Sequence, residues 1–284
     1  MHYLILTSLM WAFSYSLIKN NLTNLDAGFV SACRMVIAAL VFLPFLNWKN
    51  LKLKAVGQLM LIGAIQYGLM YLFFIRAFSY LAAHQVALFT TLTPLYVILI
   101  NDILARKIRA YYLVTAFLAA LGGMLIYYQN LKSAHLWQGF LLMQAADLSF
   151  AFGQIAYKRF RQKLPQVKDS EIYAWLFIGA AVITAIATTK FHGWYSLQKI
   201  NFSQSLVLLY LGAIASGLGF FWWNKGAVTT DAGVLAVFNN LKSPLAILVS
   251  VMFFHEKMNM LTLTSGLILI VIALWLANLK APRH

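Results

Sequence analysis

The sequence predicts an all-α integral membrane protein with ten transmembrane helices in two inverted five-helix repeats. Of its 284 residues, 62% are hydrophobic and 10% charged, whereas soluble domains average about 45–50% apolar and about 25% charged residues. The apolar residues gather in runs of roughly 20, the length that crosses a bilayer as a helix. The chain also shows a weak internal similarity at an offset of 150 residues.

Helices rather than barrel strands are expected, because the connections are short and no run alternates as a lipid-facing strand does. The first apolar run lacks a basic start and a small-residue cleavage signal, so we interpret it as a retained span rather than a signal peptide. The ten spans are expected at residues 3–18, 27–46, 55–77, 80–101, 110–128, 137–157, 171–190, 204–224, 231–254 and 260–279.

The basic residues predict the orientation. With an even number of spans both termini share one side, and the loops place 14 of the 22 Lys and Arg residues on that side and six on the other. The positive-inside rule then predicts a cell (inner) membrane protein with both termini in the cytoplasm. Since the net charge of +15 is explained in this way, no nucleic-acid partner is expected.

The internal repeat relates the fourth span to the ninth. Residues 93–95, Thr-Pro-Leu, match residues 243–245, Ser-Pro-Leu. An odd number of helices in each half inverts the second copy relative to the first. We expect repeats at residues 1–134 and 135–284, and hinges or broken helices at Pro94 and Pro244, because proline leaves a helix carbonyl without its N–H donor.

Two charges are predicted at the midplane. At about 1.5 Å per residue, Asp147 lies roughly 15 Å from the outer end of the sixth span and Lys242 roughly 16 Å from the inner end of the ninth. Ionisable residues at this depth usually mark transport pathways. We expect Lys242 to bind a carboxylate or phosphate, and Asp147 to bind an amine or carry a coupling proton. The alternative is a permanent ion pair that fixes helix register.

Polar and aromatic side chains complete the predicted substrate site. Amide side chains hydrogen-bond polar atoms of a ligand, and aromatic rings stack on its planar groups. These further candidates are Trp11, Tyr15, Gln66, Tyr67, Tyr71, Gln144 and Asn239. Arg34, about 10 Å below the outer end of its span, is expected to reach the interface by snorkelling and to be structural. Trp222 and Trp223 are interpreted as interfacial anchors.

The sequence argues against an enzyme. Cys33 is the single cysteine, so neither an intrachain disulfide nor a thiolate metal site is available. No metal-ligand cluster, glycine-rich phosphate loop or histidine close to Asp147 in sequence is present. We therefore expect no catalytic residues, no metal and no cofactor.

Several motifs resemble the drug/metabolite transporter superfamily, specifically its EamA-type branch of ten-helix proteins. They are the tryptophan of MWAFSYSLIK, Arg34 in SACRMVIAAL, the paired prolines Pro94 and Pro244, and Glu256 in VMFFHEKMN, taken as a structural charge. The chain departs from the pattern after the fourth span, where Arg106 replaces the expected acidic residue. The resemblance implies a secondary transporter, often an exporter of amino acids or related metabolites.

The leading prediction is export of an amino acid or a related zwitterionic or carboxylate metabolite, by alternating access around the midplane site. The alternative is a larger anionic conjugate, such as a nucleotide sugar or a phosphorylated or lipid-linked headgroup, with Lys242 and Arg34 on its phosphates. A nonspecific channel would show folding defects rather than altered selectivity in Asp147 and Lys242 variants. The expected partners are a small-molecule substrate, the lipid bilayer and a coupling proton; the sequence carries no signal for the oligomeric state.

Overall fold

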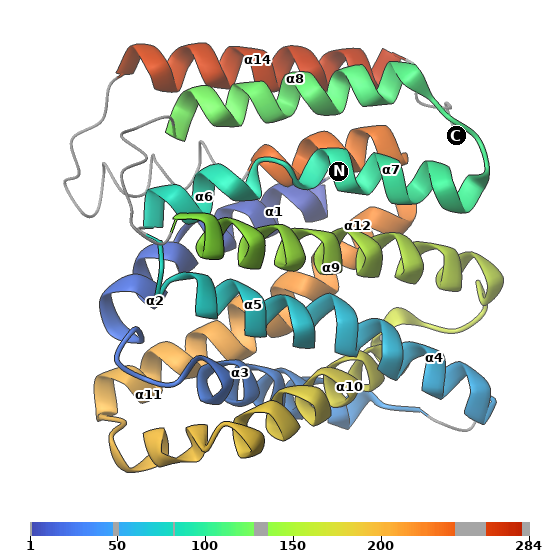
Figure 1. The fold of residues 1–284 in the computed structure, drawn as a ribbon. Helices are drawn as coiled ribbons and strands as arrows, with labels where there is room; N and C mark the ends of the chain where they lie inside the picture. Colours follow the sequence, from blue (N-terminus) through green and yellow to red (C-terminus); the bar gives the residue numbers. More distant parts are fainter. Residues whose placement is uncertain (1, 48–50, 82, 128–135, 242–259, 280–284) are drawn as a thin grey trace.

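The computed structural model describes residues 2–47, 51–81, 83–127, 136–241 and 260–279, and within these ranges all regular structure is helical (Figure 1). Six helices are long and apolar enough to cross a membrane: Ala27–Phe45, Leu53–Ala77, Gln85–Ala105, Asp169–Lys190, Phe202–Thr229 and Leu261–Leu279. Two shorter apolar helices are Ala110–Ile126 and Ala232–Leu241. The all-α class is thereby confirmed for the described residues, and the six long helices have the length and composition of membrane spans. The predicted residues Lys242, Pro244 and Glu256 lie outside the described ranges.

Two expected spans are interrupted. The first consists of α1 (His2–Ala12) and α2 (Ser14–Asn21), separated by Phe13. The fourth consists of α6 (Ala83–Thr90) and α7 (Thr93–Ala105), with Pro94 in the first turn of α7. At this second break the Thr91 and Thr93 hydroxyls donate to the carbonyls of Leu88 and Thr90, both at 2.6 Å. Side chains thus satisfy carbonyls that a continuous helix would bond with backbone N–H groups.

The third and eighth spans each contain a π-helical segment. The third is α4 (Leu53–Gly63), η2 (Ala64–Leu69) and α5 (Met70–Ala77). The eighth is α11 (Phe202–Leu209), η4 (Tyr210–Leu218) and α12 (Gly219–Thr229). π segments inside α-helices frequently occur at functional sites.

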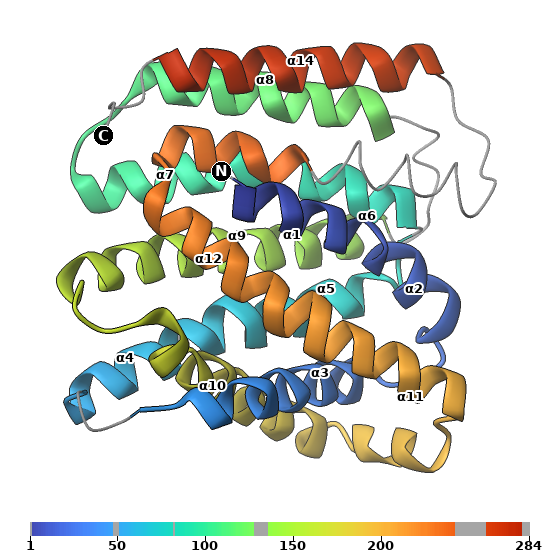
Figure 2. The same cartoon turned by 180° about the vertical axis from the view of Figure 1, so that it is seen from behind.

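Close helix contacts join elements far apart in the sequence. α3 (Ala27–Phe42) packs against α10 (Asp169–Lys190), and α8 (Ala110–Tyr127) packs against α14 (Met260–Leu279). The two pairs lie at opposite edges of the molecule in both views (Figures 1 and 2). α9 (Leu136–Lys163) runs between them and contacts α5, α7 and η2. α9 also packs against α12, so it contacts helices from both halves of the chain.

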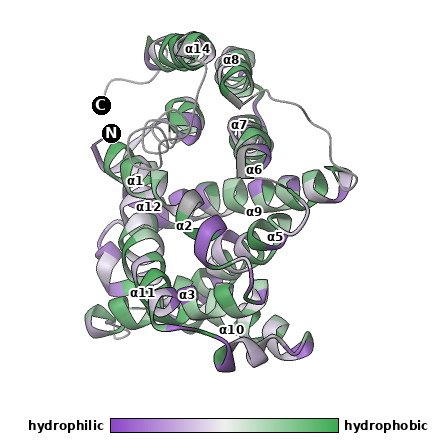
Figure 3. Cartoon of the chain, turned by 90° about the vertical axis from the view of Figure 1, so that its left-hand side faces the viewer, coloured by the Kyte–Doolittle hydropathy of each residue, from purple (hydrophilic) through white to green (hydrophobic). Residues whose placement is uncertain are grey.

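The outer helices present apolar side chains outward. Hydrophobic residues predominate on α8, α14 and α10 (Figure 3), and Phe117, Ile186 and Ile268 on these helices are more than half exposed. Such a surface suits lipid rather than water, because no polar shell covers it.

Candidate functional site

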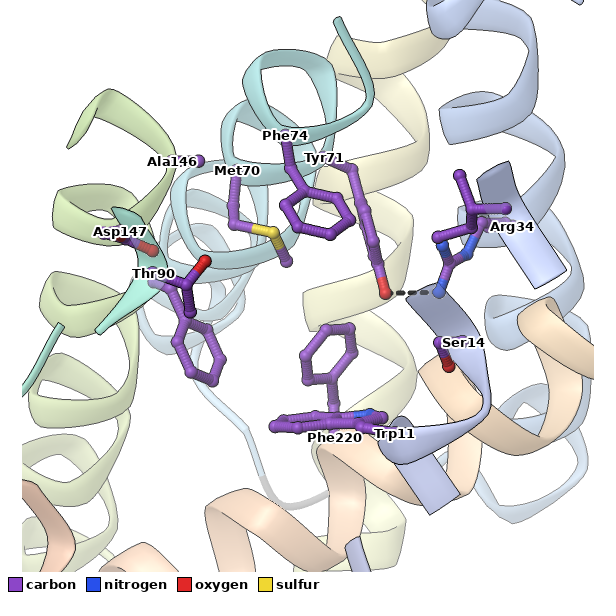
Figure 4. A pocket seen from close by; sticks show the side chains of 12 residues that line it. Trp11, Ser14, Arg34, Met70, Tyr71, Phe74, Thr90, Ala146, Asp147 and Phe220 are labelled. Atoms are coloured by element: carbon purple, nitrogen blue, oxygen red, sulfur yellow. Dashed lines mark hydrogen bonds between the residues drawn. The ribbon is translucent and has the colours of Figure 1, made fainter. Parts of the chain in front are cut away.

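A central cavity lies between α1, α2, α3, α5, α6, α9 and α12. Its lining combines aromatic and aliphatic walls with a few polar side chains: Trp11, Ser14, Ile18, Arg34, Met70, Tyr71, Phe74, Thr90, Ala146, Asp147, Phe150 and Phe220. Mostly apolar walls with a small number of polar groups are typical of small-molecule sites. Figure 4 shows Asp147 and Thr90 on one side of this cavity and Arg34 and Ser14 on the other.

Arg34 is the main electrostatic feature of the cavity. Its side chain on α3 is only 1% exposed, and its guanidinium stacks on the ring of Tyr71, 4.0 Å from the centroid. The guanidinium donates to the Tyr71 hydroxyl at 2.5 Å and to Ser216 Oγ at 3.1 Å. Ser216 lies in η4, and Tyr71 follows η2 by two residues. Both π segments therefore position partners of Arg34.

The charge of Arg34 is not neutralised by the part of the chain that the structure describes. No carboxylate there forms an ion pair with it, and its buried Nη1 has no hydrogen-bond partner. A buried charge without a compensating partner lowers the stability of the fold by about 3–5 kcal/mol, unless a ligand or another group pairs with it. The expectation that Arg34 snorkels to the interface is wrong, because neighbouring α5 and η4 enclose it; its arrangement suits an anionic ligand.

The opposite side of the cavity carries Asp147 and Thr90. Asp147, on α9, is 5% exposed and lines the cavity, as does Thr90 at the end of α6. The Thr90 hydroxyl is buried and finds no hydrogen-bond partner among the described residues. A carboxylate beside a free hydroxyl offers acceptors and a donor to a polar ligand group.

Aromatic rings form the floor between these two polar sides. Trp11 lies 5.1 Å from Phe220 and 5.0 Å from Trp223, measured between ring centroids. The Trp11 indole donates to the carbonyl oxygen of Ala215 at 2.8 Å, which fixes its orientation. Phe150 joins the same group of rings. The floor is therefore rigid and apolar.

Two residues predicted to bind substrate form hydrogen bonds to other helices. Gln66 and Asn224 exchange hydrogen bonds, with Gln66 Nε2 at 2.9 Å from Asn224 Oδ1. The Tyr67 hydroxyl accepts from Asn224 at 2.8 Å and bonds the Tyr173 hydroxyl at 2.6 Å. Neither Gln66 nor Tyr67 lines the central cavity. Each satisfies its polar atoms against another helix, as buried polar groups generally must.

A second buried network connects α9 to the eighth and ninth spans. Gln154 Oε1 accepts from Trp223 Nε1 at 2.9 Å and from Asn239 Nδ2 at 3.5 Å. The interpretation of Trp223 as an interfacial anchor is wrong, because its indole is fully buried. Gln144 accepts from the Tyr96 hydroxyl at 2.9 Å, and neither Gln144 nor Asn239 lines the cavity.

Of the predicted substrate-binding residues, the structure brings Trp11, Tyr71 and Asp147 to one cavity, and their binding role stays a prediction. The Tyr15 side chain and Lys242 lie outside what the structure describes. Sequence reasoning missed Ser14, Met70, Phe74, Thr90, Phe150, Phe220 and Ser216. These are ordinary residues in apolar runs, and only tertiary packing distinguishes them.

The fold and the cavity are those of a multi-pass helical protein with a partly open, mainly apolar central cavity. The model of the EamA-like transporter family matches residues 1–128 and 137–279, so the chain belongs to this family. The resemblance to the drug/metabolite transporter superfamily is confirmed.

Curated relatives are similar over nearly the whole chain. A biotin transporter of Escherichia coli (strain K12) is 39% identical, with 99% of this chain and 94% of the relative covered. A probable biotin transporter of Pseudomonas aeruginosa is 37% identical, with 98% of each covered. A solved crystal structure that is 18% identical gives a TM-score of 0.76 over 99% of this chain and 98% of its own, which shows a shared fold.

These findings correct the functional prediction. The family and the named relatives are transporters, so the chain is a transporter and not an enzyme. The relatives' names point to a vitamin, so both amino-acid export and transport of an anionic conjugate are wrong. Charged residues in a sequence indicate the sign of the charges that a ligand carries. The shape of the ligand depends on the residues that line the cavity, and these come together only in the folded protein.

Proposed function

We propose that this protein carries biotin across the membrane. The proposal rests on Arg34 Nη1, which has no hydrogen-bond partner among the described residues, in an aromatic cavity whose far side presents Asp147 and Thr90. Biotin is an acid whose carboxylate ends an alkyl chain, and whose bicyclic head carries a ureido group and a thioether. The named relatives supply the independent support.

Each part of biotin has a counterpart in the cavity. Arg34 binds the carboxylate, because a guanidinium is a strong, geometrically fixed donor to that group. Asp147 accepts from a ureido N–H, and Thr90 donates to the ureido carbonyl. Trp11, Phe150 and Phe220 contact the rings and the polarizable sulfur.

Binding requires adjustment of the cavity walls. The cavity volume of about 70 Å³ holds roughly five waters, which is less space than a whole biotin molecule fills. Met70 and Phe74 line the cavity from α5, and side-chain rotamer changes on binding are common. The flexible thioether chain of Met70 is the side chain most suited to move.

We also propose ten spans in two inverted repeats, residues 1–134 and 135–284. The family model matches one segment in each half, and the third and eighth spans both contain a π segment. Contacts between α8 and α14 are reciprocal, since an added Cβ at Gly122 meets Gly266 and Ile270, and one at Gly266 meets Gly122 and Ile126. Such exchange of equivalent contacts is what a two-fold axis produces.

An inner-membrane location with both termini in the cytoplasm completes the proposal. The distribution of Lys and Arg supports the orientation, and the bacterial source of the named relatives supports the membrane. Coupling to a proton through Asp147 stays a prediction.

Counterflow in proteoliposomes tests the function without assuming a direction. Purified protein in liposomes loaded with unlabelled biotin is expected to accumulate labelled biotin, and protein-free liposomes are not. Excess external biotin should abolish the signal, whereas amino acids should leave it unchanged. No accumulation of biotin by folded protein would overturn the proposal.

A further inference from the structure

A second, larger cavity lies at the opposite end of the molecule from the loop between α2 and α3. It has a volume of about 590 Å³ and lies where α7, α9, α12 and α14 end and the helix Ala232–Leu241 begins (Figure 1, right-hand side). Its lining includes Lys107, Arg109, Lys158, Thr230, Asp231 and Asn278. Among the described residues, none lines both this cavity and the central one.

The charge of this second cavity is positive. Among the described residues, three cationic side chains line it, from the connection between α7 and α8 and from α9, against one carboxylate of the lining, Asp231. Counting Asp102, which pairs with Arg109, the three cations still face only two carboxylates. Lys158 Nζ donates to the Thr230 carbonyl oxygen and forms no ion pair among the described residues. Arg109 bonds Asp102 at 2.9 Å and approaches Asp231 only to 3.9 Å. The lining thus carries more cationic than anionic side chains, and this excess of positive charge favours an anionic ligand.

Exposed apolar side chains are close in the chain to the residues that line the cavity. Ile108, between Lys107 and Arg109, is 82% exposed, and Ile103 at the end of α7 is 72% exposed. Leu104 and Leu279 are also exposed at this end. Inorganic phosphate makes no favourable contact with apolar side chains near its site, whereas a phospholipid packs its acyl chains against them.

We propose that the second cavity binds the phosphate headgroup of an anionic phospholipid. Lys107, Arg109 and Lys158 contact the phosphate, Thr230 and Asn278 bond the polar headgroup, and the exposed side chain of Ile108, between two of these cations, contacts the acyl chains. Basic pockets between transmembrane helices on the cytoplasmic side are suited to such headgroups. The cavity lies on the side where the loop charges place the cytoplasm.

Thermal unfolding of the purified full-length protein in neutral detergent tests this site. Phosphatidylglycerol is expected to raise the midpoint in a saturable way, because a ligand that binds only the folded state stabilises it by mass action. Phosphatidylcholine, with the same acyl chains, should raise it much less. High salt should reduce the difference between the two lipids. Equal stabilisation by both lipids would overturn the proposal without any variant being needed.

Charge-removing variants locate the effect. Lys107→Gln and Lys158→Gln are each expected to weaken apparent phosphatidylglycerol affinity about fivefold. Lys54→Gln is the matched control, since Lys54 is an exposed lysine on α4 that lines neither cavity, and it should retain wild-type affinity. Equal losses in all three variants would indicate a general surface-charge effect and overturn the site.

Inorganic phosphate separates a lipid from a soluble anion. It is expected to stabilise the protein only at concentrations far above those of the lipid. If inorganic phosphate alone reproduced the full shift, and Lys107→Gln and Lys158→Gln abolished it, the assignment to a lipid would be wrong.

Discussion

Arg34 is held in the protein interior by neutral partners, and this arrangement has a consequence for specificity. Tyr71 and Ser216 satisfy two guanidinium nitrogens without cancelling the charge. The cavity therefore carries a fixed positive group that cannot be deprotonated. We expect the cavity to bind biotin as the free acid in preference to neutral derivatives of biotin, such as esters.

Arg34→Gln is expected to weaken biotin binding about 10- to 100-fold, because a hydrogen-bonded charge contact contributes about 1.5–3 kcal/mol. The affinity for biotin methyl ester should fall much less, so the preference for the acid over the ester should largely disappear. Competition against labelled biotin in counterflow measures both affinities. Arg34→Lys keeps the charge and should retain part of the discrimination.

Two controls accompany the Arg34 variants. Lys190→Gln removes an exposed charge at the end of α10 and should not change either affinity. Tyr71→Phe removes a partner of Arg34 while keeping the ring beneath the guanidinium, and it should weaken binding less than Arg34→Gln. Undiminished acid-over-ester selectivity in folded Arg34→Gln would contradict the assignment of the carboxylate site.

Asp147 is expected to bind the ureido group, at the end of biotin opposite to its carboxylate. Asp147→Asn replaces an acceptor-only carboxylate by an amide, and it should weaken binding of biotin more than binding of a ureido-N-methylated biotin. The ratio of the two inhibition constants in counterflow is the measurement. Were the ratio the same as in wild type, Asp147 would not contact the ureido group.

The helices show where hydropathy is a sufficient guide and where it is not. The apolar runs predicted α3, α10 and α14 to within a few residues, because lipid demands a nearly continuous apolar segment. The π segments of the third and eighth spans left no trace in the sequence, since an extra residue in one turn does not alter mean hydropathy. Pro94 lies in the first turn of α7, directly after the break between α6 and α7, and its role as a hinge stays a prediction.

The site was predicted only in part for a related reason. Asp147, which lines the central cavity, was selected from the sequence because a lone charge in an apolar run is conspicuous. Gln66 is equally conspicuous, yet it bonds Asn224 on another helix, and periodicity does not reveal which helix a side chain meets. Arg34 was misjudged because depth along a span says nothing about whether lipid or protein surrounds it.

Helix contact through glycine gives a prediction at the scale of the element. A Cβ at Gly63 on α4 would lie 1.9 Å from the Leu176 carbonyl oxygen of α10. Gly63→Ala must push the two backbones apart, and overpacking of this kind typically costs about 1–3 kcal/mol. A lower unfolding midpoint in detergent is expected.

Gly57→Ala is the matched control on the same helix. A Cβ there meets nothing within 4 Å, so alanine should be neutral or slightly stabilising through its helix propensity. If Gly57→Ala and Gly63→Ala lowered the midpoint equally, helix packing would not explain the effect.

The whole molecule is held together by contacts between its two halves. α3 packs against α10 and η4, α9 against α5 and η2, and α8 against α14. At the break in the fourth span, Asn240 Nδ2 donates to the carbonyl oxygens of Thr91 and Ala119, at 3.0 and 2.8 Å. Arg34 of the first half bonds Ser216 of the second. Residues of both halves are therefore needed to complete the central cavity, and several buried polar groups find their partners across the two halves.

Separate expression of residues 1–134 and 135–284 tests this division. Each half alone is expected to be degraded or to aggregate, because it exposes glycine-lined faces and unpaired polar groups. Expressed together, the halves should copurify and support biotin counterflow, since each contains whole spans. A chain divided after residue 150, within α9, is the control and should not reassemble, because the cut breaks a helix inside the membrane. Stable folding of either half alone would show that the repeats are independent domains rather than interdependent halves of one site.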